Sequence, residues 1–380
     1  MSTLPLFPVT SVGSWPRSRE VLFAQRDKQA GRLSEEEFER VADRSVAEVV
    51  RLQEEAGVDL VTDGEQRRDN FFSFVAEKLE GVRLMTLAEM LDVVEDKAGF
   101  EEILQTLDVP AYSIRNATCV GKVKRRKPLA VHELQALRRM TDKPVKIPLP
   151  GPYLLTRSMF VPSLTSSFYP TKEDLGEDVV QVLRAEMHDL IEKGVDFIQL
   201  DEPVLTELVF TQGRTRTFMC AALAARKDPK EELEFAVNLI NRVVEGMEGV
   251  RIGLHVCRGN WSTDESTLLS GNYQPLASYF TRMNVDQLVL EYATERAGDI
   301  MKFGDYELGL GVVNPRIERV ETPQEIQQSV ERALELYPPE KLFLNPDCGF
   351  GTFSARPVSN SDIAFQKLRS MVEAARMLRG

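Results

Sequence analysis

Residues 252–260 read Ile-Gly-Leu-His-Val-Cys-Arg-Gly-Asn, an apolar run that ends in a histidine and a cysteine just before a glycine. The apolar run predicts a β-strand, and alternate residues of a strand point to the same side. His255 and Cys257 would therefore face one point at the end of this strand. An imidazole and a thiolate are ligands that Zn²⁺ prefers, so the pair predicts half of a metal site.

Two later strand-like segments also end in side chains that bind metals. Residues 288–291 read Leu-Val-Leu-Glu, and residues 343–349 read Phe-Leu-Asn-Pro-Asp-Cys-Gly. The three segments together offer a tetrahedral zinc site with the ligands His255, Cys257, Glu291 and Cys348. Glu291 has an alternative role, because it could pair with an arginine instead. The remaining cysteines and histidines are predicted to be structural or to lie away from the site: Cys119, Cys220, His132 and His188.

Strands of this kind alternate with helices along the chain. Apolar periodicity and capping residues predict helices over residues 34–57, 174–193, 229–248, 323–336 and 361–379. Eight segments end as strands, at Gly13, Thr62, Pro150, Leu200, Leu254, Leu290, Val312 and Asn345. The alternation predicts an α/β protein in which residues 1–380 form a single (β/α)8 TIM-barrel catalytic domain. Residues 82–145 break the rhythm and are predicted to be an insertion after the second strand, with strand-like character over residues 111–123.

Active sites of such barrels lie at the C-terminal ends of the strands. Besides the metal set, polar residues follow three of the predicted strands, at Ser14, Glu65 and Asp201. A buried carboxylate beside a metal typically binds a cationic group of a substrate. Two structural alternatives stay open: the Asp-Glu-Pro sequence at 201–203 could cap a helix, and Glu65 could pair with the arginines at 67 and 68.

Composition excludes several other classes of protein. The net charge of −12 argues against general nucleic-acid binding, and the basic run at residues 122–127 is expected to be a solvated loop or hairpin face. Four scattered cysteines are too few for a disulfide framework. The N-terminal residues do not resemble a signal peptide, and no apolar run approaches the roughly 18–20 residues that span a bilayer. A cytoplasmic protein without membrane partners is expected.

Several short blocks of the chain, taken in order, resemble the catalytic C-terminal barrel of the cobalamin-independent methionine synthase family. The resemblance covers nearly the whole chain, in blocks at residues 12–16, 63–65, 151–152, 199–203, 255–257 and 345–349. It implies that zinc is bound by His255, Cys257, Glu291 and Cys348. It also implies that the amino group of homocysteine is bound by Glu65 and Asp201, and its carboxylate by Val12, Gly13 and Ser14.

The chain departs from the family on the side of the methyl donor. Full-length members carry a second, N-terminal barrel, for which this chain has no room. Ser158 occupies the position of the family's folate-stacking tryptophan, and no histidine stands at 313–314, where the family has its proton donor. The proton donor is therefore unknown. The positions implied to contact the donor are Thr118 and Cys119, which stand where the family has an Arg-Cys pair, together with Ser158 and Glu207, and Glu207 matches a folate-contacting glutamate.

The expected function is zinc-dependent methyl transfer to the thiol of homocysteine, which forms methionine. The donor is methyltetrahydrofolate or, as in short single-barrel members, methylcobalamin on a corrinoid protein. One alternative is alkyl transfer to another thiol such as coenzyme M, as in epoxyalkane-type transferases. Arg17 and Arg19 keep this alternative open, although the acidic pair Glu65 and Asp201 suits an amino group rather than a sulfonate. Another alternative is a non-catalytic zinc-binding accessory protein, which the absent histidine would suit.

Overall fold

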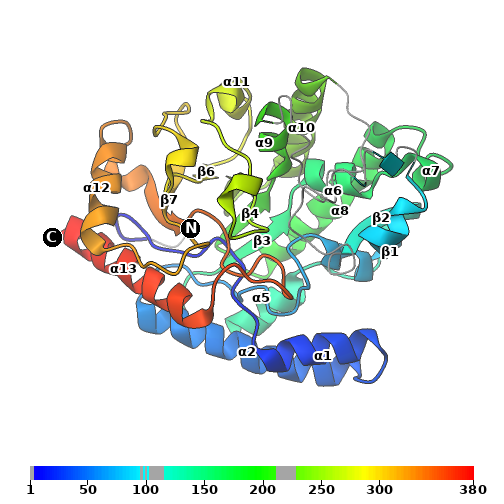
Figure 1. Ribbon diagram of the computed structural model, residues 1–380, viewed down its shortest axis with the longest axis horizontal. Coiled ribbons are helices and arrows are strands. Elements are labelled where there is room, and N and C mark those ends of the chain that lie inside the picture. Colours follow the sequence, from blue (N-terminus) through cyan, green and yellow to red (C-terminus); the bar gives the residue numbers. More distant parts are fainter. Residues whose placement is uncertain (1–3, 95–96, 99–100, 102–114, 211–227) are drawn as a thin grey trace.

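The computed structural model describes residues 4–94, 97–98, 101, 115–210 and 228–380 (Figure 1). Cys220 and residues 111–114 of the predicted strand-like segment lie outside these ranges. Six parallel strands form a sheet in which each strand pairs with the next along the chain. They are β3 (Lys146–Pro150), β4 (Phe197–Asp201), β5 (Arg251–Val256), β6 (Gln287–Leu290), β7 (Glu307–Val313) and β8 (Leu342–Pro346).

Two very short parallel segments close this sheet into a barrel. Residues 9–10 pair with Leu344 on one side and with Leu60 on the other, and Val61 pairs with Val145 just before β3. The predicted eight-stranded barrel is therefore confirmed, although its first two strands are reduced to single bridges. One physical reason is that the Val9 amide donates to the Asp59 side chain at 2.8 Å, which takes a backbone donor out of the ladder.

Helices surround the barrel, and four of the five predicted ones differ from the structure by a few residues at their ends. Capping residues explain these limits: Thr171 forms a capping box at the start of α8, and Gly57 ends α2 in the left-handed conformation. The helices are α1 (Arg19–Gln29), α2 (Glu35–Ala56), α3 (Leu87–Leu91), α5 (Val131–Arg138), α6 (Pro152–Met159), α7 (Pro162–Thr165), α8 (Lys172–Glu192), α9 (Val204–Phe210), α10 (Pro229–Val244), α11 (Ala277–Phe280), α12 (Pro323–Leu334) and α13 (Ser361–Arg379). Shorter 3-10 helices are η1 (Ser73–Glu77), η3 (Glu265–Thr267), η4 (Gln274–Leu276), η5 (Glu295–Ala297) and η6 (Pro339–Lys341).

The insertion contains an antiparallel hairpin of β1 (Leu79–Thr86) and β2 (Arg115–Arg125), which lies beside α6, α7 and α8 (Figure 1). Its predicted limits, 82–145, are wrong at both ends. The hairpin begins at Leu79, and α5 packs between α2 and α8 as a helix of the barrel wall, with Leu134 and Leu137 fully buried. The basic run at 122–127 lies at the end of this hairpin and is mostly exposed, as expected. Among the described residues, no helix combines the length and apolarity needed to cross a membrane.

Candidate functional site

A cavity opens at the C-terminal ends of the barrel strands. Its wall contains most of the polar residues that the sequence places at strand ends. They come from both short first segments, from β4 and β5, and from the turn after β8. These side chains are Ser14, Glu65, Asp201, His255, Cys257 and Cys348, and the apolar Val12 lies in the same wall.

A three-residue group in this wall could hold a metal ion. One ligand atom each of His255, Cys257 and Cys348 lies within 4.8 Å of the others, and all three residues are buried. The Cys348 thiol donates a hydrogen bond to the Cys257 sulfur, which lowers the pKa of Cys257 and raises that of Cys348. One thiolate is therefore already favoured here, and a thiolate is the form of cysteine that binds metals.

The orientation of His255 suits a metal at its other ring nitrogen. His255 Nδ1 lies 2.9 Å from Asp201 Oδ1, whereas Nε2 is buried without a hydrogen-bond partner among the described residues. A carboxylate at one nitrogen is the usual device that orients a metal-binding imidazole. Burial lowers the pKa of His255, but the Asp201 hydrogen bond and the negative charge of Cys257 outweigh it and raise the pKa to about 9. These negative surroundings favour a cation at this point.

Glu291, the predicted fourth ligand, falls outside the 4.8 Å group. Its carboxylate is buried among three arginines, at 3.3 Å from Arg296 and 3.6 Å from both Arg258 and Arg316. The arginine alternative is thus what this structure shows. The Oε1 atom of Glu291 nevertheless has no hydrogen bond among the described residues. Sequence reasoning missed these arginines, although Arg258 directly follows Cys257.

Glu65 stands out by its backbone and by its unpaired oxygen. It adopts the left-handed conformation, with φ 54°, which is uncommon for a residue other than glycine and often marks a functional position. Oε2 of the buried Glu65 carboxylate has no hydrogen bond among the described residues. Burial raises the pKa of Glu65 to about 7, against the opposing effects of Arg68 and Arg17. A Cβ at Gly13 would lie 2.6 Å from Glu65 Oε1, so a larger residue there would displace this carboxylate.

The neighbouring arginines at 67 and 68 have other carboxylate partners. Arg67 pairs with Glu39 and Asp43, and Arg68 forms a buried pair with Glu133 at 2.5 Å. The structural alternative for Glu65, a direct pair with one of these arginines, is therefore not what the structure shows.

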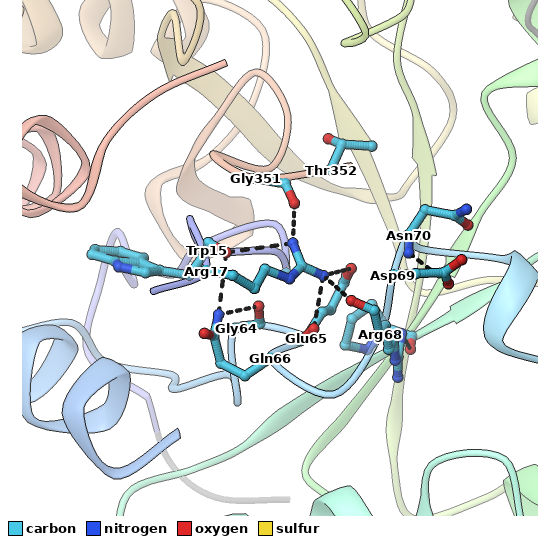
Figure 2. A network of polar contacts seen from close by, with 12 residues as sticks. Trp15, Arg17, Gly64, Glu65, Gln66, Arg68, Asp69, Asn70, Gly351 and Thr352 are labelled. Atoms are coloured by element: carbon cyan, nitrogen blue, oxygen red, sulfur yellow. Dashed lines mark hydrogen bonds and ion pairs between the residues drawn. The ribbon is translucent and has the colours of Figure 1, made fainter. Parts of the chain in front are cut away.

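The two terminal nitrogens of Arg17 bind groups of the protein itself (Figure 2). Its guanidinium donates to the backbone oxygens of Trp15, Gly351, Glu65 and Arg68, and it lies 3.9 Å from the Glu65 carboxylate. Arg19 lies at the exposed start of α1. Neither arginine lines the cavity. The described wall therefore lacks the two cations that were considered as partners for the sulfonate group of coenzyme M.

In the Asp-Glu-Pro sequence at 201–203, one carboxylate caps a helix and the other faces the cavity. Glu202 accepts hydrogen bonds from the backbone amides of Tyr153 at 2.7 Å and Leu154 at 2.9 Å, and so caps α6. Asp201 instead faces the cavity. The adjacent carboxylates thus support a helix and the site, respectively.

The four positions implied for the donor lie away from the cavity wall. Cys119 donates to the Gly121 oxygen, Ser158 to the Leu155 oxygen, and Glu207 pairs with Arg157 at 3.0 Å. Thr118 and Cys119 are buried in strand β2 of the hairpin, Ser158 on α6 and Glu207 on α9. Part of the cavity wall is instead aromatic, which the sequence analysis missed for want of a local signal: Phe71, Phe72, Trp261 and Phe353.

Comparisons with known proteins agree with this architecture. The family described as "Cobalamin-independent synthase, Catalytic domain" matches residues 7–377. The chain is 32% identical to a methionine synthase of Thermococcus kodakarensis, over 99% of this chain and 94% of that protein. It is 31% identical to a methionine synthase of Saccharolobus solfataricus, over 100% of this chain and 97% of that protein.

A solved B12-independent methionine synthase from Shewanella shares the fold. Its TM-score is 0.73 at 21% sequence identity, and the match covers 99% of this chain and 98% of that one. This likeness shows the fold, and the sequence matches show the family. The chain belongs to the family of the cobalamin-independent synthase catalytic domain.

Proposed function

We propose that this protein transfers a methyl group to the thiol of homocysteine and so forms methionine, with zinc as its cofactor. One observation carries the proposal: a buried His-Cys-Cys group shares a cavity with two carboxylates, Glu65 and Asp201. A thiol that also bears an ammonium group needs both features in one place. The names of the relatives, methionine synthases over nearly the whole chain, support the same activity.

The residues present fit a zinc ion. His255 offers an unpaired Nε2, Cys257 and Cys348 offer sulfur, and Glu291 has an oxygen without a hydrogen bond among the described residues. Nitrogen, sulfur and carboxylate ligands are the set that zinc takes in proteins. Bound zinc supplies thiol activation, because it lowers the pKa of a coordinated thiol from about 8.5 and makes the nucleophilic thiolate available at neutral pH.

The chain's own residues bind and orient the amino acid. The unpaired Glu65 oxygen and the cavity-facing Asp201 provide negative charge for its ammonium group. Ser14 lies in the same wall and, with Val12 and Gly13, is the proposed contact for its carboxylate. When both the ammonium and the carboxylate group are bound, the thiol can point in only one direction. Such orientation can lower the activation free energy by up to roughly 7–11 kcal/mol.

The described cavity wall favours a corrinoid methyl donor over a polyglutamyl folate. Among its described residues there is no lysine or arginine to bind glutamyl carboxylates. Ser158 and Glu207, which correspond to folate positions, are buried within the protein. The aromatic part of the wall suits a large ring system that presents a methyl group.

The test is methionine formation by the zinc-loaded protein with homocysteine, using methylcobalamin and methyltetrahydrofolate as donors in parallel. We expect turnover with methylcobalamin and little or none with the folate. The control is the Glu65→Gln variant, which should keep its zinc and lose most of the homocysteine binding. Failure of both donors, in protein that contains zinc and binds homocysteine, would contradict the proposed methyl transfer from these donors.

A further inference from the structure

Lys146 begins strand β3, and its side chain is completely buried. Burial lowers the pKa of its ammonium group to about 7, and the Asp201 carboxylate opposes this only in part. Among the described residues its Nζ makes one hydrogen bond, to Gln199 Oε1 at 3.2 Å, and no ion pair. A buried lysine without a carboxylate partner is costly to a fold, so its presence needs an explanation.

The partner of Lys146 begins a chain of hydrogen bonds that ends at the metal group. A lysine ammonium only donates, so the Gln199 atom that faces it is the carbonyl oxygen. The Gln199 amide nitrogen is turned the other way, where Nε2 donates to Asp201 Oδ1 at 2.8 Å and to the Val12 oxygen at 3.1 Å. Asp201 Oδ1 in turn lies 2.9 Å from His255 Nδ1. Four side chains are therefore linked in series.

The strands hold these four side chains in register. Gln199 and Asp201 are two residues apart on β4, so both point to the same side of that strand. Asp201 stands beside His255 of β5 in the parallel pairing. The Lys146 ammonium also lies 5.4 Å from the centre of the Phe197 ring, which limits where it can move. The series is thus part of the rigid sheet.

We infer that Lys146 is a positioning residue for the metal-binding histidine, acting through Gln199 and Asp201. Lys146 holds the Gln199 oxygen, which leaves the amide nitrogen for Asp201. Asp201 then keeps the His255 proton on Nδ1 and leaves Nε2 free for the metal. The inference rests on the proposed function only in that a metal binds at His255, and it requires neither homocysteine nor a methyl donor.

Metal affinity in the Lys146→Met variant provides the test. Without its donor, the buried Gln199 oxygen loses its partner, and the amide is then held only by its nitrogen, at Asp201 and the Val12 oxygen. We expect zinc affinity, measured by competition with a chromophoric chelator, to fall about tenfold, the lower end of the effect of outer-shell partners. Lys146→Arg keeps a donor and should recover part of the affinity.

A matched control separates positioning from simple loss of stability. Lys367 on α13 is also buried, but it pairs with Glu321. Lys367→Met should lower the melting temperature without changing zinc affinity. If Lys367→Met weakens zinc binding as much as Lys146→Met does, the effect is general destabilisation and the inference is wrong.

A double-mutant cycle tests the route through Gln199. If Lys146 acts through Gln199, the double variant of Lys146→Met and Gln199→Met should bind zinc as Gln199→Met alone does. Additive losses would overturn the route. Nitrogen NMR of the zinc-loaded protein gives a second readout: His255 should carry its proton on Nδ1 and the metal on Nε2 in the natural protein, and should show a mixture of tautomers in the variants. An unchanged tautomer in Gln199→Met would overturn the inference even if Lys146→Met does not fold.

The outcome is also separable from that of the proposed function. A natural protein that binds no zinc would contradict the proposed function. Normal zinc binding that is unchanged in Lys146→Met would contradict the positioning role alone.

Discussion

The cavity and the region around the hairpin both contain buried cysteine, glutamate and hydroxyl side chains, but they differ in how these groups are paired. In the cavity wall, Glu65 Oε2 and His255 Nε2 are buried without hydrogen bonds among the described residues. Near the hairpin and α6, Cys119, Ser158 and Glu207 all have protein partners, although Asn116 Oδ1 of β2 has no hydrogen bond among the described residues. Buried polar atoms without partners are rare and ask for an explanation. The difference indicates that the first region is built for a ligand and the second for the fold.

The strongest test of this contrast exchanges one buried cysteine in each region. Cys348→Ser should abolish zinc binding, measured as bound metal per chain after dialysis, because serine replaces a thiolate ligand. Methyl transfer should disappear with the zinc, while circular dichroism should show a folded barrel. Cys119→Ser is the matched control and should keep its zinc. Full zinc occupancy in Cys348→Ser would show that Cys348 is not a ligand.

The next largest effect is expected from two buried glutamates. Glu65→Gln should weaken homocysteine binding by roughly 10–100-fold, the loss that corresponds to a hydrogen bond between charged groups. Glu207→Gln should leave the affinity for homocysteine unchanged, although it lowers stability because Arg157 loses its buried partner. Calorimetric titration with zinc-loaded protein measures both. Equal losses in the two variants would remove the distinction between the regions.

A pH series should sharpen the role of Glu65. Its pKa is raised to about 7 by burial, so the carboxylate takes up a proton as the pH falls through that value. The protonated form does not attract an ammonium group, and homocysteine affinity should fall by up to about tenfold per pH unit below 7. Thiol ionisation affects the natural protein and Glu65→Gln alike. The ratio of their affinities should therefore shrink toward acid pH, and a constant ratio would argue against this assignment.

The smallest effect is expected at the aromatic part of the cavity wall. Phe353→Leu should raise the KM for the methyl donor about two- to tenfold, the worth of one aromatic contact, without changing zinc content. Phe168, an exposed phenylalanine after α7, provides the control. Phe168→Leu should leave the donor KM as it is. The same KM in both variants would mean that the donor does not contact the aromatic wall.

The barrel and the metal group were predictable because both depend on local patterns. Alternation and strand-end chemistry placed His255, Cys257 and Cys348 at one edge of a sheet, and the structure brings them together. The limit of the insertion was not predictable, since α5 is recognised as a barrel helix only by its packing against α2 and α8. The pairing of Glu291 with Arg316 joins residues from different strand ends, which no local pattern indicates.

The donor side shows a different limit of sequence reasoning. Ser158 and Glu207 were assigned by their position relative to a family motif, and such a position carries no information about burial. The aromatic residues Phe71 and Phe353 come from two loops that are far apart in the sequence. An antiparallel bridge between Asn70 and Phe353 brings these loops together. Only the folded chain shows that they share a wall.

The two short strands at residues 9–10 and 60–61 have a consequence for motion. They are attached by single bridges, whereas β3 to β8 form continuous ladders. The barrel therefore has a seam at which few hydrogen bonds must break, and its amides should exchange with solvent before those of the ladders. The loops that leave this seam carry Ser14 and Glu65, while His255 and Cys257 belong to the intact part. In the proposed enzyme, local opening of this seam would release the amino acid while His255 and Cys257 keep their places in the sheet.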